Sequence, residues 1–271
     1  MGTTDTDETF QIPLEAAETY ERDFVPALFA EWAPITLGGV SLDPGDRLLD
    51  IACGTGIVSR TAHDTWGGAI TVTGVDLNQA MLTVARRMAP AIEWVEGDAA
   101  RLPMDDDSFD AATCQMAFMF LPDRRGALTE MARVVRPGGR LAVLVPAGLE
   151  AQPAYAPFVE VAVGHSGEDA RTMLGTYWNC GDADAFTGVA TEAGWADAAA
   201  VTTLGAARFT SIEAFVDTEL DATPLGERIT DEARAEIVAD LRPELSQYLV
   251  DHQRDEELAL PFACHLVTGT A

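Results

Sequence analysis

Residues 47–59 read Arg-Leu-Leu-Asp-Ile-Ala-Cys-Gly-Thr-Gly-Ile-Val-Ser, an apolar run that leads into two closely spaced glycines and a second apolar segment. The first run is short enough to be a buried parallel strand. Gly54 and Gly56 would let the backbone pass close to a ligand, and a helix that begins there points free N–H groups at it. The turn alone is a weak signal, because Ser59 stands where a dinucleotide-binding turn has its third glycine.

Strand-like and helix-like segments alternate after this turn. The strand-like segments are residues 70–75, 92–96, 109–114 and 140–145, and the helical patterns are residues 56–63, 78–88 and 125–135. Such alternation indicates βαβ units, so we expect an α/β fold with a doubly wound parallel sheet. The other predicted elements are helices at 14–32, 184–193, 211–220 and 231–250, and strands at 198–204 and 258–268.

The chain divides into a core and three flanking parts. Residues 1–40 are expected to form a helical segment over the site, and residues 41–146 the ligand-binding core. Residues 147–182 hold Gly, Pro and aromatic residues but no strand-like run, which predicts a helical cap insertion. Residues 183–271 are expected to complete the sheet and to carry inserted helices.

Composition favours a small-molecule substrate. The 271 residues carry a net charge of -27, and all 17 basic residues are Arg. Nucleic acid and anionic membranes are disfavoured as partners, because both require a cationic surface. The acidic surface fits simple solvation or a high-salt host. With no long apolar stretch and a polar, acidic start, we expect a cytoplasmic monomer or homodimer.

Three carboxylates are predicted to line one edge of the sheet. Asp76 ends the second strand, 22 residues beyond Gly54, close to the spacing at which a carboxylate accepts hydrogen bonds from a ribose. Asp50 ends the first strand and Asp98 the third. An acidic rim would repel the pyrophosphate of a dinucleotide and attract a sulfonium and an ammonium group. The pattern therefore favours a cationic, adenosine-containing cofactor.

Five motifs together carry a family resemblance. They are residues 48–59 (LLDIACGTGIVS), 75–82 (VDLNQAML), 96–99 (EGDA), 109–110 (FD) and 136–141 (RPGGRL). In this order they resemble class I S-adenosylmethionine-dependent methyltransferases, in the branch of the ubiquinone and menaquinone C-methyltransferases. The resemblance covers roughly residues 40–146 and implies a seven-stranded, mostly parallel Rossmann-like sheet with an antiparallel last strand and a helical cap. The one departure is Ala52, which replaces the family's first glycine.

The resemblance also implies a set of cofactor contacts for S-adenosylmethionine, which yields S-adenosylhomocysteine as product. They are Asp50 with the backbone at Ala52, Gly54 and Gly56 for the methionine portion, Asp76 for the ribose, Leu77, Met81, Asp98 and Ala99 for the adenine, Gln115 facing the methyl group, and Tyr20 closing the pocket. The structural alternatives are an ordinary strand-to-helix turn for the glycines, a helix cap for Asp76 and a core aromatic for Tyr20.

Methyl transfer needs alignment and exclusion of water more than acid–base groups. His165 is the one histidine considered as a base, although a lone His in a cap is more often a packing residue. Aromatic residues that could wall a flat pocket or simply form core are Phe24, Phe118, Tyr155, Phe158, Tyr177 and Trp178. The four cysteines lack any C-x-x-C pair, so we expect neither disulfides nor a metal site.

The resulting expectation is a methyltransferase that acts by in-line displacement on a small aromatic or quinone-like acceptor, at oxygen, carbon or nitrogen. Two alternatives stay open. One is a nicotinamide-dependent oxidoreductase that uses the same glycine turn, and it is disfavoured by Ser59 and Asp98. The other is a protein of the same fold that binds the cofactor without transferring a methyl group.

Overall fold

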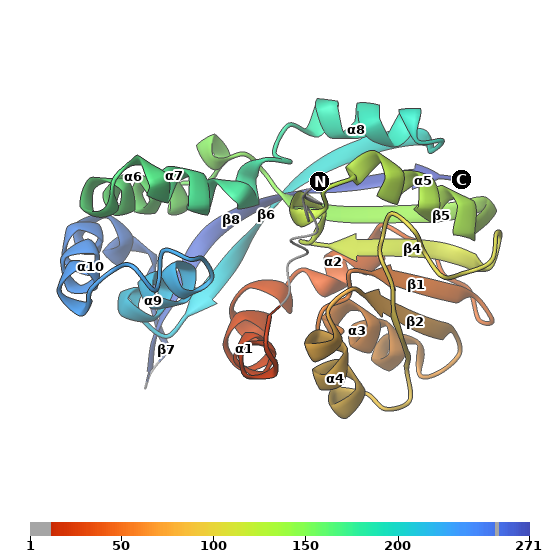
Figure 1. The fold of residues 1–271 in the computed structure, drawn as a ribbon, viewed down its shortest axis with the longest axis horizontal. Helices are drawn as coiled ribbons and strands as arrows, with labels where there is room; N and C mark the ends of the chain where they lie inside the picture. Colours follow the sequence, from red (N-terminus) through yellow and green to blue (C-terminus); the bar gives the residue numbers. More distant parts are fainter. Residues whose placement is uncertain (1–11, 253–254) are drawn as a thin grey trace, which may run out of the picture.

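The computed structural model describes residues 12–252 and 255–271, and within them eight strands form one sheet. The strand order is β3-β2-β1-β4-β5-β8-β6, and β7 pairs with β8 (Figure 1). The strands are β1 (Arg47–Ile51), β2 (Thr71–Asp76), β3 (Glu93–Glu96), β4 (Phe109–Gln115), β5 (Val135–Pro146), β6 (Ala196–Phe209), β7 (Leu249–His252) and β8 (Asp255–Thr270). Strands β1 to β5 pair in parallel, whereas β8 runs antiparallel to β5, β6 and β7. The α/β class and the antiparallel last strand are confirmed, but there is one strand more than the seven predicted.

Neighbouring residues of one strand contribute to two separate cores. Leu48 packs in a cluster with residues of α2, α3 and α4, while Leu49 belongs to the larger cluster that contains residues of α5 and α8. This alternation follows from the strand geometry, in which successive side chains point to opposite faces. Helices therefore cover both faces of the sheet (Figure 1). These helices are α2 (Ala33–Gly38), α3 (Ile57–Trp66), α4 (Gln79–Met88), α5 (Arg124–Val134) and α8 (Ala183–Glu192).

The prediction of one continuous N-terminal helix at residues 14–32 is wrong. The chain instead forms α1 (Leu14–Thr19), a wide π-helical segment η1 (Tyr20–Phe29) and, after a short turn, α2. Pro26 lies inside η1 and has no N–H to donate, and the Ala30 N–H reaches back five residues to the Val25 carbonyl at 2.8 Å. This irregular segment lies beside the glycine turn.

A second group of helices gathers at one end of the molecule, and we call it the cap (Figure 1). It consists of α6 (Tyr155–Ser166), α7 (Glu168–Gly175), α9 (Ile212–Asp221) and α10 (Asp231–Leu245), with the short helical turns η3 (Leu149–Ala151), η4 (Thr176–Trp178) and η5 (Ser246–Tyr248) close in sequence. The long strands β6 and β8 run from the core into this region and stay paired from Ala196 and Thr270 to Phe209 and Leu258. The cap is thus attached through continuous sheet.

The predicted C-terminal boundary of the helix at residues 231–250 is also wrong. It stops at Leu245, and after η5 the backbone of Leu249 pairs with Leu258, which makes β7 the eighth strand. Pro243 removes one N–H from the last turn of α10, and the β-branched Val250 suits a strand.

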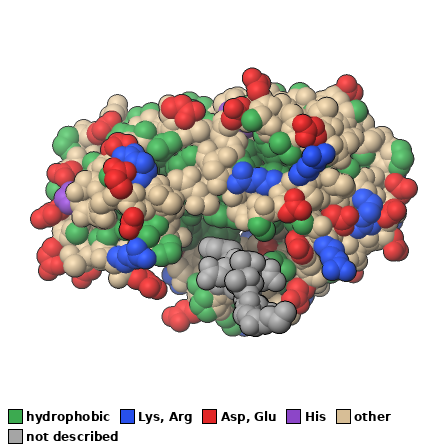
Figure 2. Space-filling model, turned by 45° about the horizontal axis from the view of Figure 1, so that its top comes forward, with side chains coloured by type: hydrophobic (Ala, Val, Ile, Leu, Met, Phe, Trp, Pro, Cys, Tyr) green, Lys and Arg blue, Asp and Glu red, His purple; other side chains and the backbone are tan. Residues whose placement is uncertain are grey.

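The surface of the protein is acidic. Figure 2 shows carboxylates spread over the face in view, with arginines standing among them, and a hollow lined by hydrophobic side chains. All four cysteines are buried and free. Within the described ranges, no helix is long and apolar enough to cross a membrane.

Candidate functional site

The parallel strands bring the predicted residues to one edge of the sheet. Strand β1 lies between β2 and β4, and β3 lies beside β2, so the carboxyl ends of all four meet there. The Gly54 N–H donates to Asp76 Oδ2 at 2.8 Å, and the Gly97 N–H donates to the Asp76 carbonyl at 3.0 Å. The glycine turn, the end of β2 and the loop that carries Asp98 are therefore directly connected.

The two glycines of the turn have different neighbours. Both have positive φ, 56° at Gly54 and 88° at Gly56, which favours glycine at each position. Among the described residues, a Cβ on Gly54 would meet the Tyr20 side chain alone, with its hydroxyl oxygen 3.7 Å away, whereas a Cβ on Gly56 would lie 2.2 Å from Trp94. Gly54 is thus the glycine that faces the site, and Gly56 makes room for a core side chain.

Ala52 adopts φ 51° in the same turn. An L-residue pays on the order of 1–2 kcal/mol for this left-handed conformation. Alanine at this position therefore carries a conformational strain that glycine would not.

Asp50 is almost completely buried and holds the start of α3 against the sheet. Its Oδ2 accepts from the Ser59 hydroxyl at 2.7 Å and the Ser59 N–H at 3.1 Å, and its Oδ1 accepts from the Thr113 hydroxyl at 3.1 Å. Burial raises the pKa of Asp50 to about 6, against the lowering effect of these hydrogen bonds. Ser59, at the position of the absent third glycine, thus has a defined role as the donor to Asp50.

Asp76 combines burial with backbone hydrogen bonds. Besides the bond from Gly54, its Oδ1 accepts from the Asn78 N–H at 2.8 Å, while Asn78 caps α4 through its own side chain. Burial raises the pKa of Asp76 above its ordinary value, and the backbone N–H groups oppose that rise. Each carboxylate oxygen can accept more than one hydrogen bond, so Asp76 keeps capacity for a ligand hydroxyl.

Asp98 and Ala99 begin the loop that joins β3 to β4. Asp98 is exposed and accepts from the Ala100 N–H at 2.9 Å, and Ala99 is buried. Leu77 is partly exposed and Met81 is buried, both close in sequence to Asp76. These are the residues that the resemblance assigns to the adenine.

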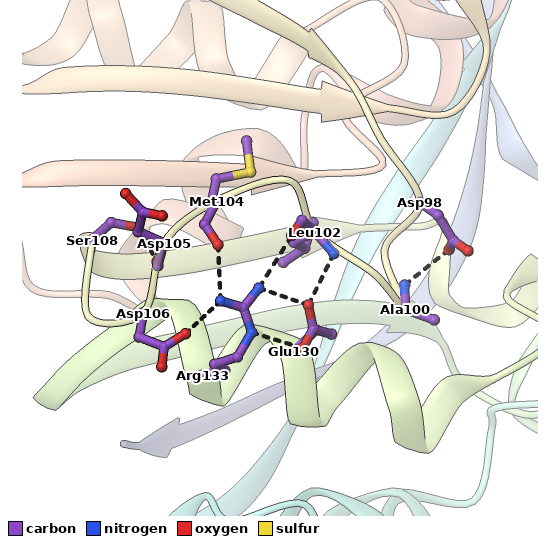
Figure 3. Close-up of polar contacts among 9 residues, drawn as sticks. All are labelled: Asp98, Ala100, Leu102, Met104, Asp105, Asp106, Ser108, Glu130 and Arg133. Atoms are coloured by element: carbon purple, nitrogen blue, oxygen red, sulfur yellow. Dashed lines mark hydrogen bonds and ion pairs between the residues drawn. The ribbon is translucent and has the colours of Figure 1, made fainter.

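Arg133 holds this loop from α5, as Figure 3 shows. Its guanidinium donates to the carbonyls of Leu102 at 3.1 Å and Met104 at 2.8 Å, and it pairs with Glu130 and Asp106 at 2.7 Å each. The Glu130 carboxylate in turn accepts from the Leu102 N–H at 3.0 Å. The sequence reading did not single out this clamp.

The N-terminal segment covers the glycine turn and the end of β1. The rings of Tyr20 and Phe29 stack on each other beside the turn, with their centroids 5.2 Å apart. A space of only about 20 Å³ remains beside Asp50 and Ala52. Gln115 also lines this space, but its side-chain amide donates to the Phe29 carbonyl at 3.0 Å and accepts from the Thr36 hydroxyl at 2.7 Å. The carboxylates and backbone groups suit a cationic ligand, and the Tyr20 and Phe29 rings leave little free space beside Asp50.

A larger cavity of about 460 Å³ opens between the strand ends and the cap. Its lining includes Tyr20, Phe24, Met81, Met116, Met119, Phe120, Tyr155, Tyr177, Trp178, Glu219 and Phe262. Met116, directly after Gln115, adopts φ 49°, a strained conformation of the kind found at functional sites. Volume and lining are those of a small-molecule pocket.

The aromatic set divides between pocket and core. Phe24, Tyr155, Tyr177 and Trp178 line the cavity, whereas Phe118 and Phe158 are buried in the core and do not line it. His165 is outside the cavity lining, at the end of α6, where it pairs with Asp240 at 2.9 Å and Glu236 at 3.4 Å on α10. This position argues against a role for His165 as a base.

Glu219 was missed by the sequence reading. It lines the cavity from α9 and is 6% exposed. Its neighbours on the buried face of that helix are Ile212, Phe215, Val216 and Leu220. A glutamate on the apolar face of a helix was the signal that could have identified it.

Known proteins resemble this chain in sequence and in fold. Residues 49–143 match the family described as a methyltransferase domain. The demethylmenaquinone methyltransferase of Staphylococcus epidermidis is 30% identical over 179 residues, 61% of this chain and 74% of that enzyme. The enzyme of the same name from Renibacterium salmoninarum is 36% identical over 127 residues, 47% of this chain and 51% of the relative, so this match spans about half of the relative's length.

A solved structure from Anabaena variabilis, described as a methyltransferase from an antibiotic biosynthesis pathway, has the same fold. Its TM-score is 0.64 at 18% identity, with 89% of this chain and 97% of that chain covered. The sequence similarity, the parallel strands and the turn at their carboxyl ends thus agree. The chain belongs to the class I S-adenosylmethionine-dependent methyltransferases.

Proposed function

We propose that this protein transfers a methyl group from S-adenosylmethionine to a small, apolar acceptor of aromatic or quinone-like type. The observation that carries the proposal is the position of the 460 Å³ cavity, which is lined both by Met81 and Tyr20 beside the strand-end site and by aromatic side chains from the cap. An acceptor there would lie next to the cofactor and away from water. Relatives that act on demethylmenaquinone, by their names, support the quinone-like class.

The cofactor contacts follow the resemblance, adjusted to the geometry. Asp76 would accept from the ribose hydroxyls, Asp98 and the Ala99 backbone would bind the adenine amino group, and Leu77 and Met81 would pack on its faces. When bound, the cofactor supplies an electrophilic methyl group on a positively charged sulfur. Gly54 would approach the methionine portion, and Asp50, with Ala52 and Gly56, would shape its site. Gln115 would lie near the methyl group once Phe29 has moved.

The charge of the site favours this cofactor over a dinucleotide. Asp50 and Asp76 flank the turn, and their mutual repulsion contributes to the raised pKa of Asp50. A doubly negative pyrophosphate would add to that repulsion, whereas a sulfonium and an ammonium group would relieve it.

Thermal-shift titration with S-adenosylhomocysteine and with NAD tests the cofactor. We expect a rise in Tm that grows with the concentration of S-adenosylhomocysteine, and stabilisation by NAD alone would overturn the proposal. Methyl transfer is tested with labelled cofactor and a panel of quinols, phenols and amines. Labelled product from an aromatic hydroxyl compound supports the proposal. Cofactor binding with no product across the panel would favour a non-methylating function instead.

A further inference from the structure

Glu219 is a buried carboxylate among the aromatic side chains that line the cavity. It extends from α9, is 6% exposed, and lies among the lining residues Tyr155, Tyr177 and Trp178. A buried glutamate is normally paired with a cation. In residues 12–252 and 255–271, Glu219 forms no ion pair.

The hydrogen bonding of Glu219 leaves one oxygen available. The Tyr155 hydroxyl donates to Oε1 at 3.1 Å, and no described residue donates to Oε2. The carboxylate is therefore held in position from one side while its second oxygen can accept a proton or a hydrogen bond.

The other charged groups at the cavity do not neutralise Glu219. Asp221, on the same helix, lines the cavity but pairs with Arg234 at 2.5 Å, which also contacts Asp217. Glu15 of α1 lines the cavity as well and is acidic. Among the lining residues that the structure describes, the other titratable groups are the phenols of Tyr20, Tyr155 and Tyr177. Burial raises the pKa of each phenol further above its ordinary value.

Aromatic rings pack around this carboxylate. Tyr155 contacts Trp178 and Phe262 edge-on, with ring centroids 5.3 and 5.2 Å apart, and Trp178 lies 6.0 Å from Phe262. Such walls favour a flat, apolar molecule, and the single carboxylate favours one that presents a hydroxyl group.

We propose that Glu219 is the catalytic base of this enzyme and that the acceptor is a phenol or hydroquinone whose hydroxyl donates to Glu219 Oε2. The inference rests on the proposed methyl transfer. In the balanced step, the O–H proton moves to the carboxylate, and the electron pair left on the ring system attacks the methyl carbon. The carbon–sulfur bond breaks with its electrons retained by sulfur, and the proton later leaves Glu219 for solvent.

The protonation behaviour of Glu219 suits this role. Burial raises its pKa to about 7, against the lowering effect of the hydrogen bond from Tyr155. A base that titrates near the working pH both accepts and releases a proton readily. The Glu219 carboxylate thus lines the cavity, whereas the His165 ring pairs with Asp240 outside the lining.

The first test compares Glu219→Gln with the control Glu213→Gln, which changes an exposed glutamate of the same helix. The glutamine keeps an acceptor for Tyr155, so the fold should persist. We expect Glu219→Gln to lower kcat by about 100-fold or more and to abolish the rise in rate through neutral pH, with KM changed less than about threefold. Glu213→Gln should behave as wild type. A Glu219→Gln variant with wild-type kcat and pH profile would overturn the inference while leaving methyl transfer standing.

The second test needs no turnover. Binding of 2-naphthol and of naphthalene is measured by fluorescence between pH 6 and 9 with the wild-type protein and both variants. We expect wild-type and Glu213→Gln affinity for 2-naphthol to rise about fivefold as Glu219 ionises, with no such rise for naphthalene or for Glu219→Gln. A pH-independent wild-type affinity for 2-naphthol would contradict the assignment. The expected rise without transfer to any acceptor would support the hydroxyl site and refute only the proposed methyl transfer.

Discussion

The indole ring of Trp94 occupies the space in which a side chain on Gly56 would have to lie. An added Cβ would come within 2.2 Å of the Trp94 ring, and the same ring lies 2.4 Å from a Cβ built on Gly74. Two glycines on neighbouring elements therefore accommodate one tryptophan. The second glycine of the turn is required by the core on which the site rests.

Replacement of Gly56 by alanine should destabilise the protein strongly. Overlap with Trp94 adds to the cost of positive φ, so we expect a loss of more than about 3 kcal/mol in the free energy of unfolding. Gly67→Ala is the matched control, because Gly67 has φ 56° and no described residue lies within 4 Å of its Cβ position. It should cost only about 1 kcal/mol. Urea denaturation measures both, and equal losses would show that Trp94 yields easily.

Removal of Arg133 should loosen the loop between β3 and β4. Its side chain is 30% exposed and binds two loop carbonyls, so we expect Arg133→Gln to lower the free energy of unfolding by about 2 kcal/mol. The control is Arg125→Gln, which changes another arginine of α5 and removes its exposed ion pair with Glu192. This substitution should lower the free energy of unfolding by less than about 0.5 kcal/mol. Hydrogen exchange should rise at residues 98–108 in the first variant alone. Unchanged exchange there would count against the clamp.

Glu219 should make stability depend on pH in a definite direction. Its pKa is higher in the folded protein, about 7, than the ordinary value of 4.5, so the folded state binds the proton more tightly. The resulting contribution is fully present below about pH 4.5 and is lost as the pH rises towards 7. Between these limits, Glu219→Gln should gain on the order of 2–3 kcal/mol relative to wild type. Denaturation curves from pH 4.5 to 8 measure the difference, and a constant difference would refute the shift.

The Glu21–Arg60 pair should oppose cofactor binding. Arg60 donates to both Glu21 oxygens at 2.8 and 2.9 Å and thereby holds η1, with Tyr20, against α3. Because the Tyr20 and Phe29 rings fill most of the space beside Asp50, where the methionine portion is proposed to bind, Glu21→Gln should tighten binding of S-adenosylhomocysteine about fivefold. Glu18→Gln, which breaks the exposed pair with Arg87, should have no effect. Calorimetric titration gives both constants, and weaker binding by Glu21→Gln would show that the pair stabilises the bound state.

Much of the core could be predicted because local signals and tertiary structure agree there. The residues from Leu48 to Ile51 are buried on both faces of the sheet. Gly54 and Gly56 adopt positive φ in the turn, a conformation that few other residues adopt easily. The errors lie in two helical patterns that contain a proline, Pro26 in the first and Pro243 in the second. The segment around Pro26 keeps a helical periodicity but widens into a π-helix, and Val250 leaves a helical pattern to pair with β8.

The acceptor side was harder to predict because its residues come from distant parts of the chain. Tyr20, Met116, Trp178 and Glu219 belong to four separate segments, and no spacing in the sequence connects them. Asp98 and Asp76, in contrast, follow consecutive strands whose order is set by the βαβ rule. The cofactor side is thus encoded by local motifs, while the acceptor side depends on how the cap packs against the core.

The attachment of the cap to the core through β6 and β8 limits how the protein can be engineered. Strands β6 and β8, 14 and 16 residues long, form one antiparallel ribbon that joins the core to the cap. Ala196 pairs with Thr270 at one end and Phe209 with Leu258 at the other, with one register shift between Ala196 and Ala199. Exchanging cap helices alone between relatives would sever this ribbon or shift its register, which turns inward side chains outward. A chimera intended to accept a new substrate should therefore transplant the ribbon and its helices as one cassette, with the junction placed in β5.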